Sequence, residues 1–140
     1  MGNDPSKRGV VAVVSSGQQL LVIQRSRHVV APGAFCFPGG GIEMGESESD
    51  ALCREFQEEL NAPLRPLRQL WTSVTPWNVE LAWWAAELPD GEILAPNPRE
   101  VEAFQWATPE EITLLPNLLV SNLHFLDAWR CGEFELTLAD

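Results

Sequence analysis

The sequence predicts an α/β fold in which helices cover both faces of a mixed β-sheet. Short apolar and β-branched segments recur along the chain and are typical of strands, whereas capped amphipathic segments between and after them are typical of helices. Tight turn signals between successive strand segments indicate that part of the sheet is antiparallel. The length of 140 residues predicts a single domain, residues 1–140.

The N-terminal part predicts a leader followed by a hairpin. Residues 1–8 are polar and lack an apolar signal region, so we expect a flexible leader there. Residues 9–15 (GVVAVVS) and 19–25 (QLLVIQR) are apolar and β-branched, which predicts two buried strands. The Ser16-Gly17 turn between them is short enough to join the two strands as a hairpin.

The next segment predicts a short strand, a glycine loop and a helix. Residues 34–37 are expected to form the strand, and the glycines of residues 38–41 (PGGG) let the backbone turn sharply or approach a ligand. Ser47, with Asp50 three residues later, resembles a capping box at a helix N-terminus. Asn61 tolerates the left-handed conformation in which many helices end.

The C-terminal half predicts three more strands, two helices and a tail. Strand patterns occur in three segments, residues 67–73, 79–88 and 101–107. Thr108 and Pro109 fit the N-cap and first position of a helix, and a second helix is expected over residues 117–130. The tail alternates apolar and polar residues, which predicts either an edge strand or packing on a partner subunit, through Phe134, Leu136 and Leu138.

Three carboxylates lie within one narrow arc of the helix predicted after the glycines. Glu55, Glu58 and Glu59 are three and four residues apart, the spacing at which helical side chains are neighbours. Like charges at this spacing destabilise a helix by about 0.2–0.5 kcal/mol per pair. A hard divalent cation, which prefers oxygen ligands, would offset this repulsion. An apolar stripe beside the arc can bury while the arc faces a cleft: Leu52, Phe56 and Leu60.

The spacing of this segment resembles the signature of the Nudix hydrolases. Gly40 precedes Glu46 with five residues between them, and seven further residues lead to Arg54-Glu55-Phe56-Gln57-Glu58-Glu59. Asn61 and Ala62 stand where the family has Gly and an aliphatic residue, and residues 35–41 (FCFPGGG) resemble its lead-in. The specific motif covers residues 35–62, and the resemblance implies a Nudix-type α/β/α sandwich over most of the chain.

The resemblance also implies a metal-dependent mechanism. Glu55, Glu58 and Glu59 would bind Mg²⁺, with Mn²⁺ as a substitute. The backbone carbonyl of Gly40 would be an extra ligand. Arg54 would orient the glutamates through charge-assisted hydrogen bonds.

The resemblance leaves the general base open. One of the three glutamates, or a later acidic residue, would accept the proton of the attacking water. The family often places a catalytic acidic residue before a Trp, so Glu100 and Glu102, upstream of Trp106, are further candidates. Glu46 would be a structural residue or a secondary metal contact.

Candidate substrate contacts lie in three places. Arg25 and Arg27 could meet phosphates at the end of a predicted strand, with a solvated strand end as the alternative. Gly39 would let the backbone approach the substrate. Trp83 and Trp84 are adjacent in a strand and point to opposite faces, so one could stack on a base, with core packing as the alternative.

Composition bounds the partners and the compartment. A net charge of −11 argues against a nucleic-acid polymer as a binding partner. It does not exclude a small nucleotide, because a metal can bridge nucleotide phosphates to acidic side chains. No apolar run reaches membrane-spanning length, so no membrane association is expected. Three cysteines without a CxxC pair imply no disulfide framework and fit a cytoplasmic location. His28 and His124 stand alone in the sequence, so neither is expected to bind a metal.

The sequence therefore predicts a hydrolase, a Mg²⁺-dependent nucleotide pyrophosphatase that cleaves a phosphoanhydride bond in a nucleoside diphosphate linked to another group. The lack of Tyr and of a full NADH-type marker around Pro76-Trp77 favours a MutT-like enzyme for a nucleoside triphosphate or related small nucleotide. One alternative is a hydrolase of ADP-ribose or NADH-type dinucleotides; another is a nucleotide sensor, which the complete set of glutamates disfavours. Isopentenyl diphosphate isomerisation, which would use Cys36, is a third. A homodimer is left open.

Overall fold

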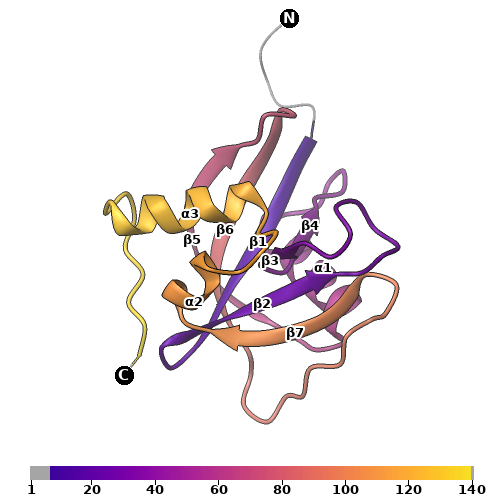
Figure 1. Cartoon of the computed structure of the whole chain (residues 1–140). Helices are drawn as coiled ribbons and strands as arrows, with labels where there is room; N and C mark the ends of the chain where they lie inside the picture. The colour runs from indigo at the N-terminus through magenta and orange to yellow at the C-terminus, as the bar shows by residue number, and fades with distance from the viewer. Residues whose placement is uncertain (1–6, 140) are drawn as a thin grey trace, which may run out of the picture.

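The computed structural model describes residues 7–139, in which seven strands and three helices follow one another (Figure 1). In the first half of this range four strands precede a helix: β1 (Lys7–Ser16), β2 (Gln19–Arg25), β3 (Phe35–Cys36), β4 (Gly39–Gly41) and then α1 (Glu48–Leu60). The second half contains β5 (Arg65–Val74), β6 (Val79–Glu87), β7 (Val101–Ala107), α2 (Pro109–Thr113) and α3 (Val120–Arg130).

Strand β1 lies at the centre of a mixed sheet. It pairs in parallel with β6 along most of its length, and β5 continues the sheet antiparallel to β6. On its other side β1 pairs with β4, whereas its hairpin partner β2 joins it only at Ser15↔Leu20 and Ser16↔Gln19. Strands β3 and β7 flank β2. Because β1 and β2 pair only beside their turn, the β3–β2–β7 strands diverge from the rest of the sheet.

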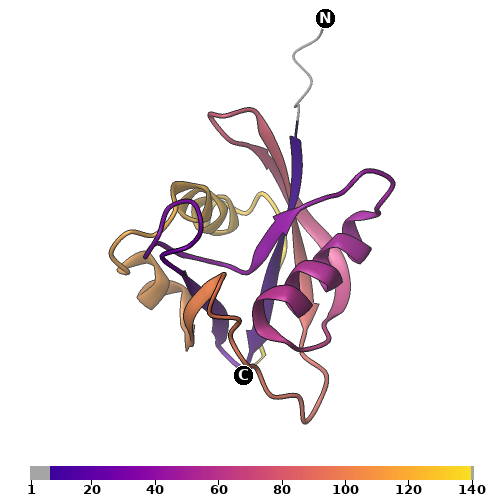
Figure 2. The same ribbon diagram turned by 90° about the vertical axis from the view of Figure 1, so that its right-hand side faces the viewer.

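Helices cover both faces of this sheet, as the sequence predicts. Figure 2 shows α1 on one side of the central strands and α2 and α3 on the other. Alternate residues of β1 supply the two cores: Val10, Ala12 and Val14 pack on the α1 side, and Val11 and Val13 pack on the α3 side. The structure is therefore the α/β/α sandwich expected from the sequence.

Local signals at α1 act as predicted. The Ser47 side chain accepts a hydrogen bond from the Asp50 backbone N–H at 3.1 Å. The helix ends at Asn61, which adopts the left-handed conformation with φ 54°. The apolar stripe is buried, and it fixes which side of the helix faces the sheet: Leu52, Phe56 and Leu60.

Three predicted boundaries were wrong. Strand β1 already includes Lys7 and Arg8, which were assigned to the leader; the rest of that leader, residues 1–6, lies outside the described residues. The glycines of β4 form a strand because Gly9↔Gly41 and neighbouring pairs bond to β1. Helix α3 begins only at Val120, because residues 117–119 exchange backbone hydrogen bonds with Phe35.

The C-terminal tail packs on its own chain rather than forming an edge strand. Phe134 stacks on Phe125 with ring centroids 4.8 Å apart. The indole N–H of Trp129 donates to the Leu136 carbonyl at 3.0 Å, and Gln18 donates to the Ala139 carbonyl at 2.7 Å. Side-chain donors thus replace the strand pairing expected for these alternating apolar residues.

No helix within residues 7–139 has both the length and the apolar character that a membrane crossing needs.

Candidate functional site

The three glutamates of α1 project together but differ in exposure. Glu59 is buried, with 6% of its surface exposed, and accepts a hydrogen bond from the Gly39 N–H at 3.0 Å. The Glu55 side chain is 14% exposed and that of Glu58 is 46% exposed. The set therefore extends from the sheet surface towards solvent, as a site between a core and a cleft requires.

Arg54 connects two of these glutamates, Glu55 and Glu58, to the loop before the helix. Its Nε and Nη2 donate to the two carboxylate oxygens of Glu46 at 2.7 and 2.9 Å, and its Nη1 donates to Glu55 at 3.0 Å and Glu58 at 3.3 Å. Its Nη2 also donates to the Gly41 carbonyl at 2.8 Å. This two-oxygen pairing lowers the pKa of Glu46 to about 2. Arg54 thus bonds two of the glutamates that it is expected to orient, and Glu46 is its principal partner.

Burial makes the inner carboxylates costly to ionise. It raises the pKa of Glu59 well above its ordinary value and also raises the pKa of Glu55, although Arg54 opposes the shift at Glu55. Repulsion among neighbouring glutamates acts in the same direction as burial. A bound cation would favour the ionised forms, so these groups have the electrostatic character of an acidic metal site.

Glycines of β4 allow the backbone to lie directly against this cluster. A Cβ added at Gly40 would stand 2.2 Å from the Glu55 carboxyl group, so no larger residue fits without displacing that carboxylate. At Gly39 a Cβ would stand 2.2 Å from the Val10 carbonyl oxygen. The sequence predicted a sharp turn or a close approach to a ligand; in the structure the glycines lie close to Glu55 and to β1.

The donor set fits a hard divalent cation, although it is not preassembled. Among residues 7–139, no three His, Cys, Asp or Glu side chains are already grouped as a metal site. Arg54 holds Glu55 and Glu58 in this arrangement, and Glu59 is bonded to Gly39. The available ligands are carboxylates and a nearby backbone carbonyl, which is the chemistry that Mg²⁺ prefers.

Of the two later acidic candidates, Glu100 rather than Glu102 lies near the cluster. After burial, the charge of Glu100 contributes to raising the pKa of both Glu55 and Glu59. Glu102 is exposed on β7 and contributes to neither shift. The electrostatics of the cluster therefore favour Glu100 over Glu102, and a catalytic role for Glu102 stays a prediction.

A cleft of about 650 Å³ adjoins the carboxylate loop. Its walls come from the start of β1, from β4 with the loop to α1, from β6 and from the start of α3. Arg25 and Gly39 line this cleft, and the Arg25 Nε donates to the Val30 carbonyl at 2.6 Å. Arg27 is exposed and does not line it, so of the two predicted arginines the structure brings only Arg25 to the cleft.

The prediction that Trp83 or Trp84 reaches the cleft was wrong. Trp83 has no exposed surface and stacks on Phe125 with ring centroids 4.8 Å apart. Trp84 packs on the α1 side, where its indole N–H donates to Glu48 at 2.8 Å. Neither residue lines the cleft, because Trp83 packs in the core on the α3 side and Trp84 packs against the core on the α1 side.

Sequence reasoning missed Asn122, a buried residue that lines the cleft. Its side-chain oxygen accepts the Phe37 N–H at 2.9 Å, and its amide donates to Ser121 at 3.2 Å. The sequence did contain a signal for Asn122, which is a polar residue on the apolar face of the helix.

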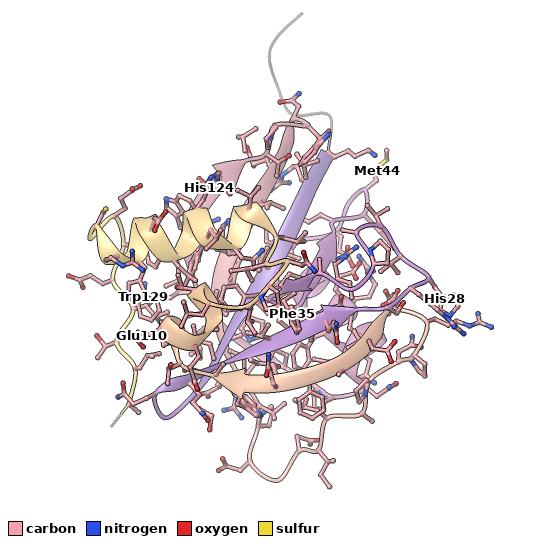
Figure 3. The ribbon with its side chains drawn as sticks, in the orientation of Figure 1. His28, Phe35, Met44, Glu110, His124 and Trp129 are labelled. Atoms are coloured by element: carbon pink, nitrogen blue, oxygen red, sulfur yellow. The ribbon has the colours of Figure 1, made fainter. Side chains whose placement is uncertain are left out.

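The two histidines cannot act together. Figure 3 shows His28 and His124 on opposite sides of the molecule, one on the loop after β2 and the other on α3. Met44, on the loop between β4 and α1, also points outward in this view, and it is fully exposed.

Known proteins match this chain in sequence and in fold. A family model, the NUDIX domain, matches residues 5–129. The NAD-capped RNA hydrolase NudC of Stutzerimonas stutzeri is 30% identical over 108 residues, 76% of this chain and 38% of that protein. The nucleoside triphosphatase NudI of Escherichia coli is 38% identical over 65 residues, 46% of this chain and 43% of that protein. The matches thus span less than half the length of these relatives.

Solved structures agree in fold. The E. coli ORF135 protein superposes with a TM-score of 0.73 at 24% identity, covering 95% of this chain and 94% of that one. The MutT protein of Methanosarcina mazei Go1 gives 0.76 at 16% identity, covering 96% and 100%. At these identities the structures show the fold alone, whereas the family model matches most of the sequence. The chain therefore belongs to the NUDIX domain family.

Proposed function

We propose that the chain is a Mg²⁺-dependent pyrophosphohydrolase that cleaves a phosphoanhydride bond in a nucleoside diphosphate linked to another group. The observation that carries this proposal is the set of three carboxylates on α1, two of which, Glu55 and Glu58, are connected by Arg54 to a loop that lines the cleft. A phosphoanhydride repels nucleophiles because it is negatively charged, and a carboxylate-held cation is suited to overcoming that repulsion.

Glu55, Glu58 and Glu59 would hold the metal, with the Gly40 carbonyl as a further ligand and Mn²⁺ as a substitute ion. When bound, the ion neutralises phosphate oxygens and lowers the pKa of water. Arg54 orients Glu55 and Glu58 through its shared Nη1.

A general base is proposed among two residues. Glu58 is the most exposed of the three helix glutamates, so its carboxylate is the one that a water molecule reaches most readily. Glu100 is the alternative, because it lies near Glu55 and Glu59 without belonging to the helix. Arg25, which lines the cleft, is proposed to contact a substrate phosphate.

The substrate is proposed to be a nucleoside triphosphate or a related small nucleotide. The cleft volume lies within the range of small-molecule sites, about 300–1,000 Å³. Similarity to a protein named as a nucleoside triphosphatase supports this choice. Similarity to proteins named as NAD-capped RNA hydrolases supports the second candidate, an NADH-type dinucleotide.

The two non-hydrolytic alternatives are less well supported. A sensor without turnover has no need of the complete carboxylate set that α1 keeps. For isomerisation, the thiol of Cys36 would have to exchange protons, yet burial raises its pKa to about 11.

A substrate panel with Mg²⁺ tests the proposal. It contains canonical and oxidised nucleoside triphosphates, ADP-ribose, NADH, dinucleoside polyphosphates and nucleotide sugars, with products identified by mass. Glu58→Gln is expected to lower turnover by about 10²–10⁴-fold, the contribution typical of a general base. Glu110→Gln, the same change on the exposed first turn of α2, is the matched control. Full activity of Glu58→Gln would contradict the assignment.

A further inference from the structure

Glu48, the first residue of α1, accepts hydrogen bonds from three different strands. Arg8 of β1 donates through Nη2 at 2.9 Å, Gln69 of β5 through Nε2 at 2.8 Å, and Trp84 of β6 through its indole N–H at 2.8 Å. The Glu48 side chain is only 22% exposed. One carboxylate therefore binds the N-terminus of the helix to three neighbouring strands of the sheet.

A favourable charge at a helix N-terminus would explain an acidic residue here, but not these partners. The dipole effect requires no hydrogen bond to the sheet, and Asp50 in the same turn is exposed without such bonds. Glu48 is instead the acceptor that satisfies the half-buried indole N–H of Trp84. Loss of the carboxylate would leave that donor without its acceptor, which is unfavourable for a partly buried group.

The position of Glu48 links this contact to the carboxylate cluster. Glu48 lies two residues after Glu46, the principal partner of Arg54, and seven residues before Glu55, which is about 10 Å along a helix. The other end of α1 has separate contacts: Asn97 donates its backbone N–H to the Glu59 carbonyl at 2.9 Å and its side-chain amide to the Glu58 carbonyl at 3.0 Å. Each end of the helix that carries the cluster is thus fixed independently.

Arg8 extends the same contact to the cleft. It lines the cleft, and its Nε lies 3.5 Å from Glu80 in addition to the Glu48 pair. Its backbone carbonyl accepts the N–H of Ile42 at 2.9 Å, in the segment that leads from β4 to α1. Helix, loop and cleft wall therefore meet at one ion pair.

We propose that Glu48 is a positioning residue for the metal carboxylates. By holding the first turn of α1 against β1, β5 and β6, it fixes the direction in which Glu46, Arg54 and the three helix glutamates project. This inference rests on the proposed function: its effect on metal binding needs only the proposed metal site, whereas its effect on turnover needs the proposed hydrolysis as well.

The test measures Mn²⁺ binding by electron paramagnetic resonance, together with kcat and KM, for Glu48→Ala, Glu48→Gln and wild type. Glu48→Ala is expected to weaken Mn²⁺ binding by about 10-fold or more, the effect typical of residues that orient metal ligands, and to lower kcat with little change in KM. Glu48→Gln keeps an acceptor for Gln69 and Trp84, so its loss is expected to be smaller. Glu87→Ala is the matched control, because it removes an exposed ion pair between Glu87 of β6 and Arg65 of β5. Its Mn²⁺ affinity, kcat and KM are expected to equal those of wild type.

Wild-type Mn²⁺ affinity in Glu48→Ala, at full folded content by circular dichroism, would overturn the proposal. If Glu48→Ala does not fold, Trp84→Phe decides, because it removes one donor and keeps an aromatic ring. Weaker Mn²⁺ binding in Trp84→Phe supports the proposal, and unchanged binding contradicts it. If wild type binds Mn²⁺ but cleaves nothing in the panel, the proposed function fails while the binding comparison still tests Glu48.

Discussion

Helices α1 and α3 cover opposite faces of the same sheet in different ways. Helix α3 places Phe125 against the rings of Trp83 and Phe134, each 4.8 Å away, and its buried Asn122 is hydrogen bonded. Helix α1 buries an apolar stripe of similar kind but also buries Glu59, whose pKa is raised. The α3 side therefore stabilises the fold, whereas the α1 side keeps ionisable groups that oppose folding and that a metal site requires.

Phe125→Ala is expected to have the largest effect on stability. Truncating a buried aromatic residue costs about 3–5 kcal/mol, because transfer energy is lost and a cavity remains. Urea unfolding measures the change, and Val120→Ala, a partly exposed position on the same helix, is the control. A loss below about 1 kcal/mol would show that the α3 side is not the main packing unit.

Glu59→Gln is expected to raise stability while lowering metal-dependent turnover. The folded-state pKa of Glu59 is raised, so the native protein binds its proton more strongly than the unfolded chain does. Wild-type stability should therefore fall as the pH rises from the ordinary Glu pKa through the raised one. Gln has no proton to lose and can still accept the Gly39 N–H, so the variant should gain on wild type towards high pH.

Urea unfolding at pH 4, 6 and 8 without metal checks the direction in which the stability difference between Glu59→Gln and wild type changes with pH. The advantage of Glu59→Gln should be smallest at pH 4 and largest at pH 8, and Glu110→Gln should show no such trend. If the unfolding free energies of wild type and Glu59→Gln changed with pH in parallel, burial of the Glu59 carboxylate would not destabilise the fold, which would contradict the prediction.

Glu102→Gln is expected to have the smallest effect. Its side chain is exposed on β7, and surface substitutions of this kind change stability by less than about 0.5 kcal/mol. Glu100→Gln, two residues earlier, should lower kcat because Glu100 lies near Glu55 and Glu59. Equal kcat values for Glu100→Gln and Glu102→Gln would contradict a role of Glu100 in turnover.

Local signals in the sequence predicted much of this structure. The cap at Ser47, the left-handed Asn61 and the N-cap at Thr108 with Pro109 after it depend on neighbouring residues alone, and all three were confirmed. The spacing of the α1 glutamates also follows from helix periodicity. Such features need no knowledge of what packs against them.

Features that depend on distant contacts could not be predicted in the same way. Trp83 and Trp84 were expected to face opposite sides of a strand, but only the packing of helices on both sides shows that neither reaches the cleft. Glu59 and Glu58 are adjacent in sequence, and their different exposure arises from the contact of Glu59 with Gly39. The proximity of Glu100 to the cluster likewise requires the fold.

The central claim is that the carboxylates on α1 form a metal site that offsets their cost to stability. The most direct test is thermal unfolding of wild type and Glu58→Gln with Mg²⁺ or with Na⁺ at equal ionic strength. A ligand that binds only the native state raises Tm. The account predicts a higher Tm with Mg²⁺ for wild type and a much smaller rise for Glu58→Gln. Equal rises in both proteins, or none in wild type, would contradict it.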